Sequence, residues 1–334
     1  MSIECGSQVV LCDMPIRFDT YKGCSHACAY CFVKRKTDIS KIEADNCVKA
    51  LVNFIKGKRT QQTNWCDWEI PLHWGGMSDP FQPCEKKHKI SLRCLKVLAE
   101  TQYPVTISTK GRLICTDEYL SVLRECNAAV QVSMVCAKYD KLERGCPPFE
   151  ERLEMVRTLA KNCKRVIIRI QPYMLEVFKD VMDNIPRFAE AGAHGITIEG
   201  MKFISKREGL VKVEGDFCYP LSLLKHDYEI IKQRCHKHGL KFYCAENRLR
   251  SMGDSMTCCG VDGLGWRVNE YNIPRIMDGE KVKPTERMRE LGTGTCFRSM
   301  YQNSEGARLC THNSFETMMS IKLKDHLRKN GKEC

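Results

Sequence analysis

The chain has 334 residues, of which 43% are hydrophobic and 28% are charged, the composition of an ordinary soluble globular protein. This length allows one large α/β barrel with a small appendage. No apolar run approaches the roughly 20 residues that a membrane helix needs. Residues 1–6 lack the basic region followed by an apolar run that marks a signal peptide. We therefore expect a cytoplasmic protein with no membrane partner.

Cysteine is the unusual residue, with 22 in the chain, and the formal net charge is +12. Secreted disulfide scaffolds are usually short and loop-rich, so this long, patterned chain fits a reducing interior with a few thiols on metal. The positive charge favours an anionic partner such as nucleic acid or a nucleotide. A solvated basic surface is the alternative, because net charge governs only non-specific attraction.

Apolar runs alternate with amphipathic segments along most of the chain, which predicts strands and helices in turn. In chain order we expect a strand at 16–21, a helix at 42–56, a strand at 70–74, a helix at 89–100, a strand at 105–109, a helix at 117–126, a strand at 130–135, a helix at 149–161, a strand at 165–170, a helix at 176–191, a strand at 195–199, a helix at 221–238 and a strand at 240–244. This alternation is typical of parallel βαβ units.

The pattern breaks after residue 244. Residues 245–310 carry many Gly, Asn, Met and Cys with little periodicity, and a helical pattern returns at 314–329. We predict an α/β fold: a partial (β/α)6 TIM-like barrel over residues 1–240, followed by an irregular Cys-rich C-terminal extension over residues 241–334. In such a barrel the functional loops follow the carboxyl ends of the strands.

Three cysteines follow the first predicted strand: Cys24, Cys28 and Cys31, separated by three and then two residues. Thiolates are the protein ligands of iron–sulfur clusters, and three of them leave one iron of a [4Fe–4S] cluster open. A structural zinc site needs a fourth ligand, for which His26 is the neighbouring candidate. Three free thiols are the alternative, but the position after the first strand favours a functional loop.

The segment at 23–32 reads Gly-Cys-Ser-His-Ala-Cys-Ala-Tyr-Cys-Phe. It resembles the hallmark motif of the radical S-adenosylmethionine (SAM) superfamily, and its sequence is most similar to the spore photoproduct lyase-like branch. The resemblance implies a [4Fe–4S] cluster on Cys24, Cys28 and Cys31 whose open iron chelates SAM. Reductive cleavage of SAM then yields a 5′-deoxyadenosyl radical that abstracts a hydrogen atom from substrate. A reducing donor such as flavodoxin or ferredoxin supplies the electron.

The resemblance continues to about residue 200. Residues 74–83 resemble the segment that meets the SAM amino group, and 108–110 resemble the Ser/Thr-Lys that ends the third strand. Lysine can pair with the methionine carboxylate, and hydroxyls can bond its polar groups. The cofactor contacts expected from the cysteine loop and the strand ends are Tyr30, Phe32, Gly75, Gly76, Ser78, Asp79, Lys110, Ser133, Arg169 and Glu199. For the last two, ion pairing within the barrel is the alternative.

One departure from the family pattern bears on the reaction. The lyase-like pattern has a hydrogen-donor cysteine at the position of Gly76, which this chain lacks, so repair of thymine dimers is not expected. Cys136, just after the fourth strand, is a candidate substitute donor. A buried, packed cysteine is the alternative reading of Cys136.

A second group of cysteines lies in irregular sequence towards the C-terminus: Cys244, Cys258, Cys259, Cys296 and Cys310. Segments that lack a core are often ordered by a metal, and similar extensions in the superfamily carry a second iron–sulfur cluster. We expect a second [4Fe–4S] cluster or a zinc ion here, with free thiols as the alternative.

These features together predict a radical SAM enzyme that abstracts a hydrogen atom from a nucleotide, DNA or a modified base. A radical SAM enzyme acting on a peptide or a small metabolite is the first alternative. A non-catalytic, metal-stapled nucleic-acid-binding protein is the alternative from another class.

Overall fold

The computed structural model describes residues 3–5, 12–44, 47–60, 63, 66, 68–213 and 216–269. Within these ranges one large sheet runs in the order β1-β2-β5-β6-β7-β8-β9-β13. Its strands are Ile3–Cys5 (β1), Ile16–Phe18 (β2), Leu72–Trp74 (β5), Val105–Thr109 (β6), Ala128–Ser133 (β7), Arg165–Tyr173 (β8), Gly195–Gly200 (β9) and Lys241–Cys244 (β13).

The sheet is parallel from β2 to β13, and β1 adds to its edge antiparallel to β2. Its two edges, β1 and β13, do not pair with each other in the described sheet, so the barrel is open. The predicted partial (β/α)6 barrel is confirmed. Because β13 pairs with β9, the sheet continues past residue 240, where we expected the barrel to end.

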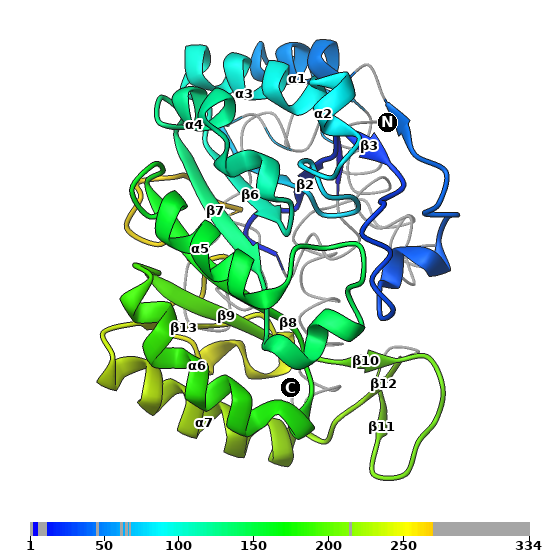
Figure 1. The fold of residues 1–334 in the computed structure, drawn as a ribbon, viewed down its shortest axis with the longest axis vertical. Helices are drawn as coiled ribbons and strands as arrows, with labels where there is room; N and C mark the ends of the chain where they lie inside the picture. Colours follow the sequence, from blue (N-terminus) through cyan, green and yellow to red (C-terminus); the bar gives the residue numbers. More distant parts are fainter. Residues whose placement is uncertain are drawn as a thin grey trace, which may run out of the picture.

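Helices connect successive strands and form an arc around them in Figure 1. They are Cys47–Ile55 (α1), Glu85–His88 (α2), Ile90–Thr101 (α3), Asp117–Leu123 (α4), Phe149–Leu159 (α5), Phe178–Glu190 (α6) and Leu221–Lys237 (α7). In α7 the buried residues Leu224, Tyr228, Ile231 and Cys235 recur at helical spacing. Strands β6 and β7 are buried along their whole length, as expected for a parallel sheet covered on both faces.

Short strands and 3-10 turns lie in the loops that connect the strands and helices of the barrel. Tyr21–Lys22 (β3) pairs with Glu43–Ala44 (β4), so these two strands enclose the cysteine loop. A three-stranded arm projects from the molecule in Figure 1 and consists of Lys202–Phe203 (β10), Val211–Val213 (β11) and Asp216–Cys218 (β12). The 3-10 turns are Phe32–Arg35 (η2), Arg112–Cys115 (η3), Ala137–Lys141 (η4), Leu175–Val177 (η5) and Asn247–Met252 (η6).

Residues 245–269 are irregular apart from η6, as predicted for this part of the extension. They pack against the inner side of the barrel: Gln131 on β7 donates to the Cys259 carbonyl at 3.0 Å, and Thr197 on β9 donates to the Cys258 carbonyl at 2.7 Å. The backbone N–H of Asn269 donates to the backbone carbonyl of Asp13 at 2.7 Å, just before β2. The segment therefore fills the open barrel from the β9 side to the β2 side.

The helix predicted at 314–329 lies outside the described residues. None of the described helices combines the length and the hydropathy that crossing a membrane requires.

Candidate active site

The cysteine loop leaves the carboxyl end of β2, the edge at which such barrels carry their functional groups. The Cys24 amide donates to the Ile39 carbonyl at 2.8 Å, which ties the start of the loop to its far end. At Gly23 φ is +73°, and a Cβ there would lie 2.3 Å from the Lys41 carbonyl oxygen. Only glycine adopts this φ without strain and leaves room for the Lys41 carbonyl. The close packing of the two ends of the loop therefore requires glycine before Cys24.

His26 is buried within the loop, and both of its ring nitrogens have protein partners. Its Nδ1 lies 2.8 Å from the Gly145 carbonyl and its Nε2 lies 3.3 Å from Asp79 Oδ2. Burial by itself lowers the pKa of His26, but the Asp79 carboxylate and the Gly145 carbonyl raise it overall. A doubly engaged imidazole is not available as a fourth ligand, which argues against the zinc site considered from the sequence.

The three loop cysteines are free thiols, with Cys28 buried and Cys24 and Cys31 half-buried. A hydrogen bond from Cys146, whose Sγ lies 3.8 Å from Cys28 Sγ, lowers the pKa of Cys28 to about 6. Burial raises the pKa of Cys24 to about 12. Thiols of this kind become ligands as thiolates, and their protons are released when the metal binds.

This donor set fits an iron–sulfur cluster better than one metal ion. Among the described residues, no three metal-ligating side chains are arranged around a single ion. A [4Fe–4S] cluster does not require such an arrangement, because each thiolate binds its own iron. Three thiols on one anchored loop, with the neighbouring imidazole engaged elsewhere, match that pattern.

Asp79 holds the cysteine loop to the ends of β5 and β6. Its carboxylate accepts hydrogen bonds from the Phe81 amide at 2.9 Å, Thr109 Oγ1 at 2.8 Å and the Lys110 amide at 2.6 Å. Burial alone raises the pKa of Asp79, but the charge and hydrogen bond of His26, together with these amides, lower it to about 2. Asp79 is therefore an ionised anchor beneath the loop.

The turn after β5 also packs tightly on its neighbours. At Gly75 φ is +90°, and a Cβ would lie 2.3 Å from the Ser108 carbonyl oxygen, so the backbone needs glycine there. Gly76 continues the turn, and Ser78 Oγ donates to the Tyr21 carbonyl at 2.6 Å. The structure thus brings the predicted segment against the cysteine loop, with the Ser78 hydroxyl bonded to protein.

Lys110 belongs to a buried charge network centred on Glu143. Its Nζ lies 3.8 Å from Glu143 Oε1 and 5.8 Å from the centroid of the Tyr30 ring. The Tyr30 hydroxyl donates to Glu143, and Arg152 Nη2 lies 2.6 Å from Glu143 Oε2. Arg152 Nη1 donates to the Ser133 carbonyl at 2.8 Å. Three predicted cofactor residues therefore meet beside the cysteine loop through two residues that we did not predict.

The part of the chain that carries this site matches a known family. Residues 19–174 match the family model described as "Radical SAM superfamily". Residues 19–174 of this chain are therefore a radical SAM domain. The chain's curated relatives include the uncharacterized protein Rv2578c of Mycobacterium tuberculosis, which is 24% identical in an alignment of 214 residues that covers 59% of this chain and 62% of that protein. The chain thus aligns with about three fifths of the length of the curated relatives.

Solved structures of spore photoproduct lyase share the fold of this chain. The lyase complexed with dinucleoside spore photoproduct superposes with a TM-score of 0.57 at 15% identity, covering 70% of this chain and 77% of that chain. A variant with bound AdoMet and dinucleoside spore photoproduct gives 0.56 at 14% identity, covering 72% and 80%. At such identities the likeness is one of fold.

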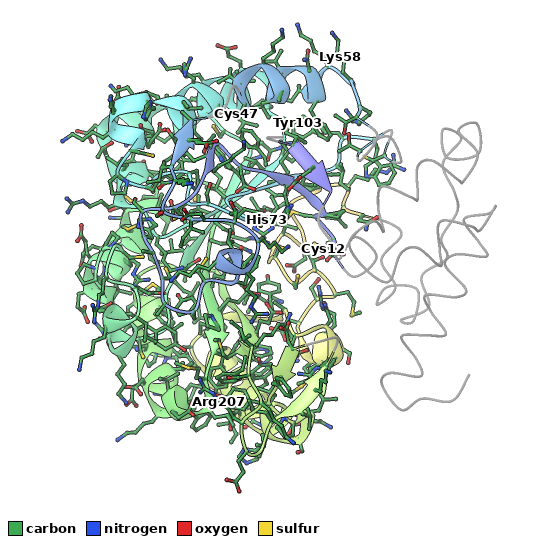
Figure 2. All side chains as sticks on the ribbon, turned by 90° about the vertical axis from the view of Figure 1, so that its right-hand side faces the viewer. Cys12, Cys47, Lys58, His73, Tyr103 and Arg207 are labelled. Atoms are coloured by element: carbon green, nitrogen blue, oxygen red, sulfur yellow. The ribbon has the colours of Figure 1, made fainter. Side chains whose placement is uncertain are left out.

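Two other predicted SAM contacts, Arg169 and Glu199, lie on β8 and β9. Arg169 Nη1 donates to Ser108 Oγ at 2.8 Å and lies 3.3 Å from Nε2 of the half-buried His73, which is labelled near the middle of the view in Figure 2. Glu199 accepts from Gln171 Nε2 at 2.8 Å and pairs with a lysine of β10 at 2.7 Å. Both side chains have barrel partners, which favours the alternative of pairing within the barrel.

The structure also shows how far two other predicted residues, Phe32 and Cys136, are exposed. Phe32 is 50% exposed at the start of η2, on the rim of the loop. Cys136 is buried within the main hydrophobic core, and burial raises the pKa of its thiol. These surroundings favour a packed cysteine over a hydrogen donor.

The second group of cysteines is only partly described. Cys244 is fully buried at the end of β13, and its thiol donates to the Glu246 carbonyl at 3.6 Å. Cys258 and Cys259 are buried with their Sγ atoms 3.8 Å apart. Cys12 lies beside this segment, because its carbonyl accepts a hydrogen bond from Asn269 Nδ2 at 3.0 Å. Cys296 and Cys310 lie outside the described residues.

Sequence patterns missed three residues of the site: Glu143, Arg152 and Cys146. Arg152 carried a signal, because it occupies the buried face of α5 between Phe149 and Leu153. A charged residue on the core-facing stripe of a helix needs a buried partner. For Glu143 and Cys146, in an irregular loop, periodicity offers no comparable signal.

Proposed function

We propose that this chain is a radical SAM enzyme that cleaves SAM reductively and abstracts a hydrogen atom from its substrate. The family match and the lyase fold support an enzyme that uses SAM and an iron–sulfur cluster. The observation that carries the proposal is the anchored loop with three free thiols, Cys24, Cys28 and Cys31, at the carboxyl edge of the sheet. The cluster, when bound, supplies an open iron for SAM and the electron that generates the 5′-deoxyadenosyl radical.

The residues around the loop have distinct tasks in this proposal. Lys110 is a half-buried cation beside the thiols and would pair with the methionine carboxylate. Glu143 holds Lys110 and Tyr30 in place, and Arg152 neutralises its charge. Asp79 and His26 keep the loop seated on the strand ends. Side chains that are held by packing and by ion pairs keep a site in its working geometry when ligands bind.

We further propose a nucleotide, DNA or a modified base as substrate. The net charge of +12 supports an anionic partner. Lys34 and Arg35 lie in the turn directly after Cys31, so positive charge adjoins the proposed active site. The lyase of the same fold was solved with a dinucleoside photoproduct. A low-potential donor such as flavodoxin or ferredoxin would supply the electron.

The enzyme proposal can be tested by anaerobic reconstitution. Wild-type protein should take up about four irons per chain at this loop and form 5′-deoxyadenosine from SAM under a low-potential reductant. Replacement of Cys24, Cys28 and Cys31 by Ala should abolish both. The matched control replaces Cys115 and Cys163, which are also half-buried and lie outside the site. SAM cleavage by the triple variant would overturn the proposal.

The substrate class needs its own assay. Single-stranded and duplex oligonucleotides, mononucleotides and a peptide library should be compared for stimulation of 5′-deoxyadenosine formation. We expect stimulation by a nucleotide or nucleic acid, together with transfer of deuterium from the labelled substrate into 5′-deoxyadenosine. Stimulation by peptides alone would replace the nucleic-acid proposal with the peptide alternative.

A second metal centre is a separate proposal. Buried Cys244, Cys258 and Cys259, with Cys12 near them, support it as a thiol-rich region of the barrel interior. A [4Fe–4S] cluster or zinc is the group that such thiols bind.

A further inference from the structure

A fourth cysteine touches the cysteine loop. Cys146 lies between η4 and α5, more than a hundred residues from the triplet, and its Sγ is 3.8 Å from Cys28 Sγ. A disulfide requires about 2.05 Å between the sulfurs, so the two thiols are in contact but not bonded. Nothing in the Cys-x3-Cys-x2-Cys spacing includes Cys146.

The backbone on both sides of the contact keeps the two thiols together. The Ala29 amide donates to the Leu142 carbonyl at 2.7 Å, and His26 Nδ1 lies 2.8 Å from the Gly145 carbonyl. A Cβ on Gly145 would lie 2.4 Å from the Ser25 carbonyl oxygen. The segment before Cys146 therefore lies directly on the loop, and only glycine permits that approach.

The direction of the thiol contact follows from what Cys28 does in the proposed function. A cysteine that binds iron does so as a thiolate, which carries no proton and can only accept. Cys146 keeps its proton, because it is outside the ligand set. The S–H of Cys146 is then the donor and the Cys28 sulfur the acceptor.

We propose that Cys146 is a positioning residue for the cluster, which donates an S–H···S hydrogen bond to the Cys28 ligand and raises the cluster's reduction potential. This inference rests on the proposed function. Hydrogen bonds to cluster sulfurs are among the factors that set the potential, because they stabilise the extra negative charge of the reduced state. In a radical SAM enzyme, that stabilisation decides how readily the cluster accepts an electron from its donor.

The same distance has one competing explanation. Two thiolates on one tetrahedral ion with metal–sulfur bonds of about 2.3 Å lie about 3.8 Å apart, so Cys28 and Cys146 could share an ion. The described residues offer no third ligand in a suitable arrangement. The experiment below separates the two, because a ligand affects metal content whereas a hydrogen-bond donor affects potential.

The test compares Cys146→Ala, Cys146→Ser and the control Cys115→Ala in the reconstituted full chain. Iron content and the midpoint potential, from an EPR-monitored redox titration, are measured for each. We expect full iron content throughout and a more negative potential for Cys146→Ala. At a fixed potential its reduced-to-oxidised ratio should fall by up to about tenfold, which equals 59 mV for one electron. The serine variant should lie between wild type and alanine, because its hydroxyl still donates.

Three outcomes would decide against the proposal. An unchanged potential in a fully loaded Cys146→Ala protein would show that the contact does not affect the cluster. Loss of iron from folded Cys146→Ala protein would make Cys146 a ligand. If neither variant folds, the cluster-free wild type is oxidised with diamide, which takes up both thiol protons and electrons as it forms the disulfide. Mass spectrometry must then find a Cys28–Cys146 disulfide, and its absence refutes the contact.

The proposed function fails in a different way. If reconstituted wild-type protein binds no iron, the cluster assignment itself is wrong, whatever the diamide experiment shows. If wild type loads normally and only the potential fails to shift, the role of Cys146 alone is refuted.

Discussion

At the residue scale, Lys110 shows how a side chain combines structural and functional duties. Its amide bonds to Asp79, whereas its ammonium lies between Glu143 and the Tyr30 ring. Burial by itself lowers the pKa of Lys110, but the Glu143 carboxylate raises it overall. Lys110 therefore stays charged beside the cysteine loop at neutral pH, as the proposed pairing with a carboxylate requires.

We predict that Lys110→Ala weakens SAM binding by roughly 1.5–3 kcal/mol, the scale for a hydrogen bond to a charged group. Equilibrium dialysis at low salt measures the affinity, and circular dichroism checks the fold. Lys110→Arg is the control, because it keeps the charge and should lose less. Equal affinity in the alanine variant and wild type would show that Lys110 does not contact SAM.

A second residue-scale prediction concerns His73 on β5. Burial, together with the nearby charges of Arg169 and Arg17, lowers the pKa of His73 to about 3. Below pH 6.5 this histidine is protonated in the unfolded chain but stays neutral in the folded chain. The unfolded state therefore binds more protons, and the free energy of unfolding decreases as the pH is lowered. The loss begins near pH 6.5 and continues towards pH 3.

Chemical denaturation at pH 7.5 and pH 5.5 tests this reasoning. His73 should account for about 1.4 kcal/mol of the stability lost between those values, since one pKa unit corresponds to 1.36 kcal/mol. His73→Gln keeps an amide that can bond to Ser108 and should lack this part of the loss. If wild type and variant have the same pH dependence, the pKa of His73 is not lowered in the folded protein.

At the element scale, the cysteine loop is held by contacts that come from distant parts of the chain. His26 links it to Asp79 after β5 and to Gly145 after η4. The 3-10 turn that follows the loop is tied to the arm, because Arg35 pairs with Asp216. The loop is short and has little core of its own, so these contacts set its shape.

We predict that His26→Ala destabilises the cluster-free protein by about 3 kcal/mol, the lower end for removing one partner of a buried pair. Asp79 keeps its amide and hydroxyl donors, which limits the cost. His236→Ala is the matched control, because His236 pairs with Asp254 at 2.8 Å but is half exposed, and it should cost under about 1 kcal/mol. Urea denaturation measures both, and similar losses would contradict the buried role of His26.

At the scale of the whole molecule, the open barrel is completed by the end of the described chain. Arg165 at the start of β8 donates to the Gly260 and Asp262 carbonyls, at 2.7 Å each. Met14, Cys258, Cys259 and Val261 form a small second hydrophobic cluster with Ala129 of β7. A barrel with an unpaired edge exposes interior apolar surface, and this segment covers it.

We predict that the second group of cysteines binds metal independently of the first. The variant in which Cys24, Cys28 and Cys31 are Ala should retain a metal after anaerobic reconstitution. Iron and sulfide near four each would indicate a cluster, and one zinc would indicate a structural site. Adding Cys258→Ser and Cys259→Ser to this triple variant should abolish the remaining metal binding. A triple variant with neither iron nor zinc would make these cysteines ordinary packed thiols.

Local pattern was enough to predict much of this protein. Buried parallel strands are continuous apolar runs and surface helices have a 3.6-residue period, so β6, α5 and β9 lie within a few residues of their predicted ranges. The cysteine triplet was equally visible in the sequence, because the three proposed ligands lie on one short loop with a regular spacing. Family, barrel and cluster loop follow from such short-range information.

The tertiary structure decided how distant segments complete the site. Glu143 meets both Lys110 and Arg152, and Cys146 meets Cys28, only because η4 and the start of α5 fold back onto the cysteine loop. The same holds for the segment at 253–269 that fills the barrel. Contacts of this kind have no period and no fixed spacing, since they depend on where whole strands bring irregular loops together. The sequence alone therefore determined the chemistry of the loop, and the fold determined the charges and thiols that surround it.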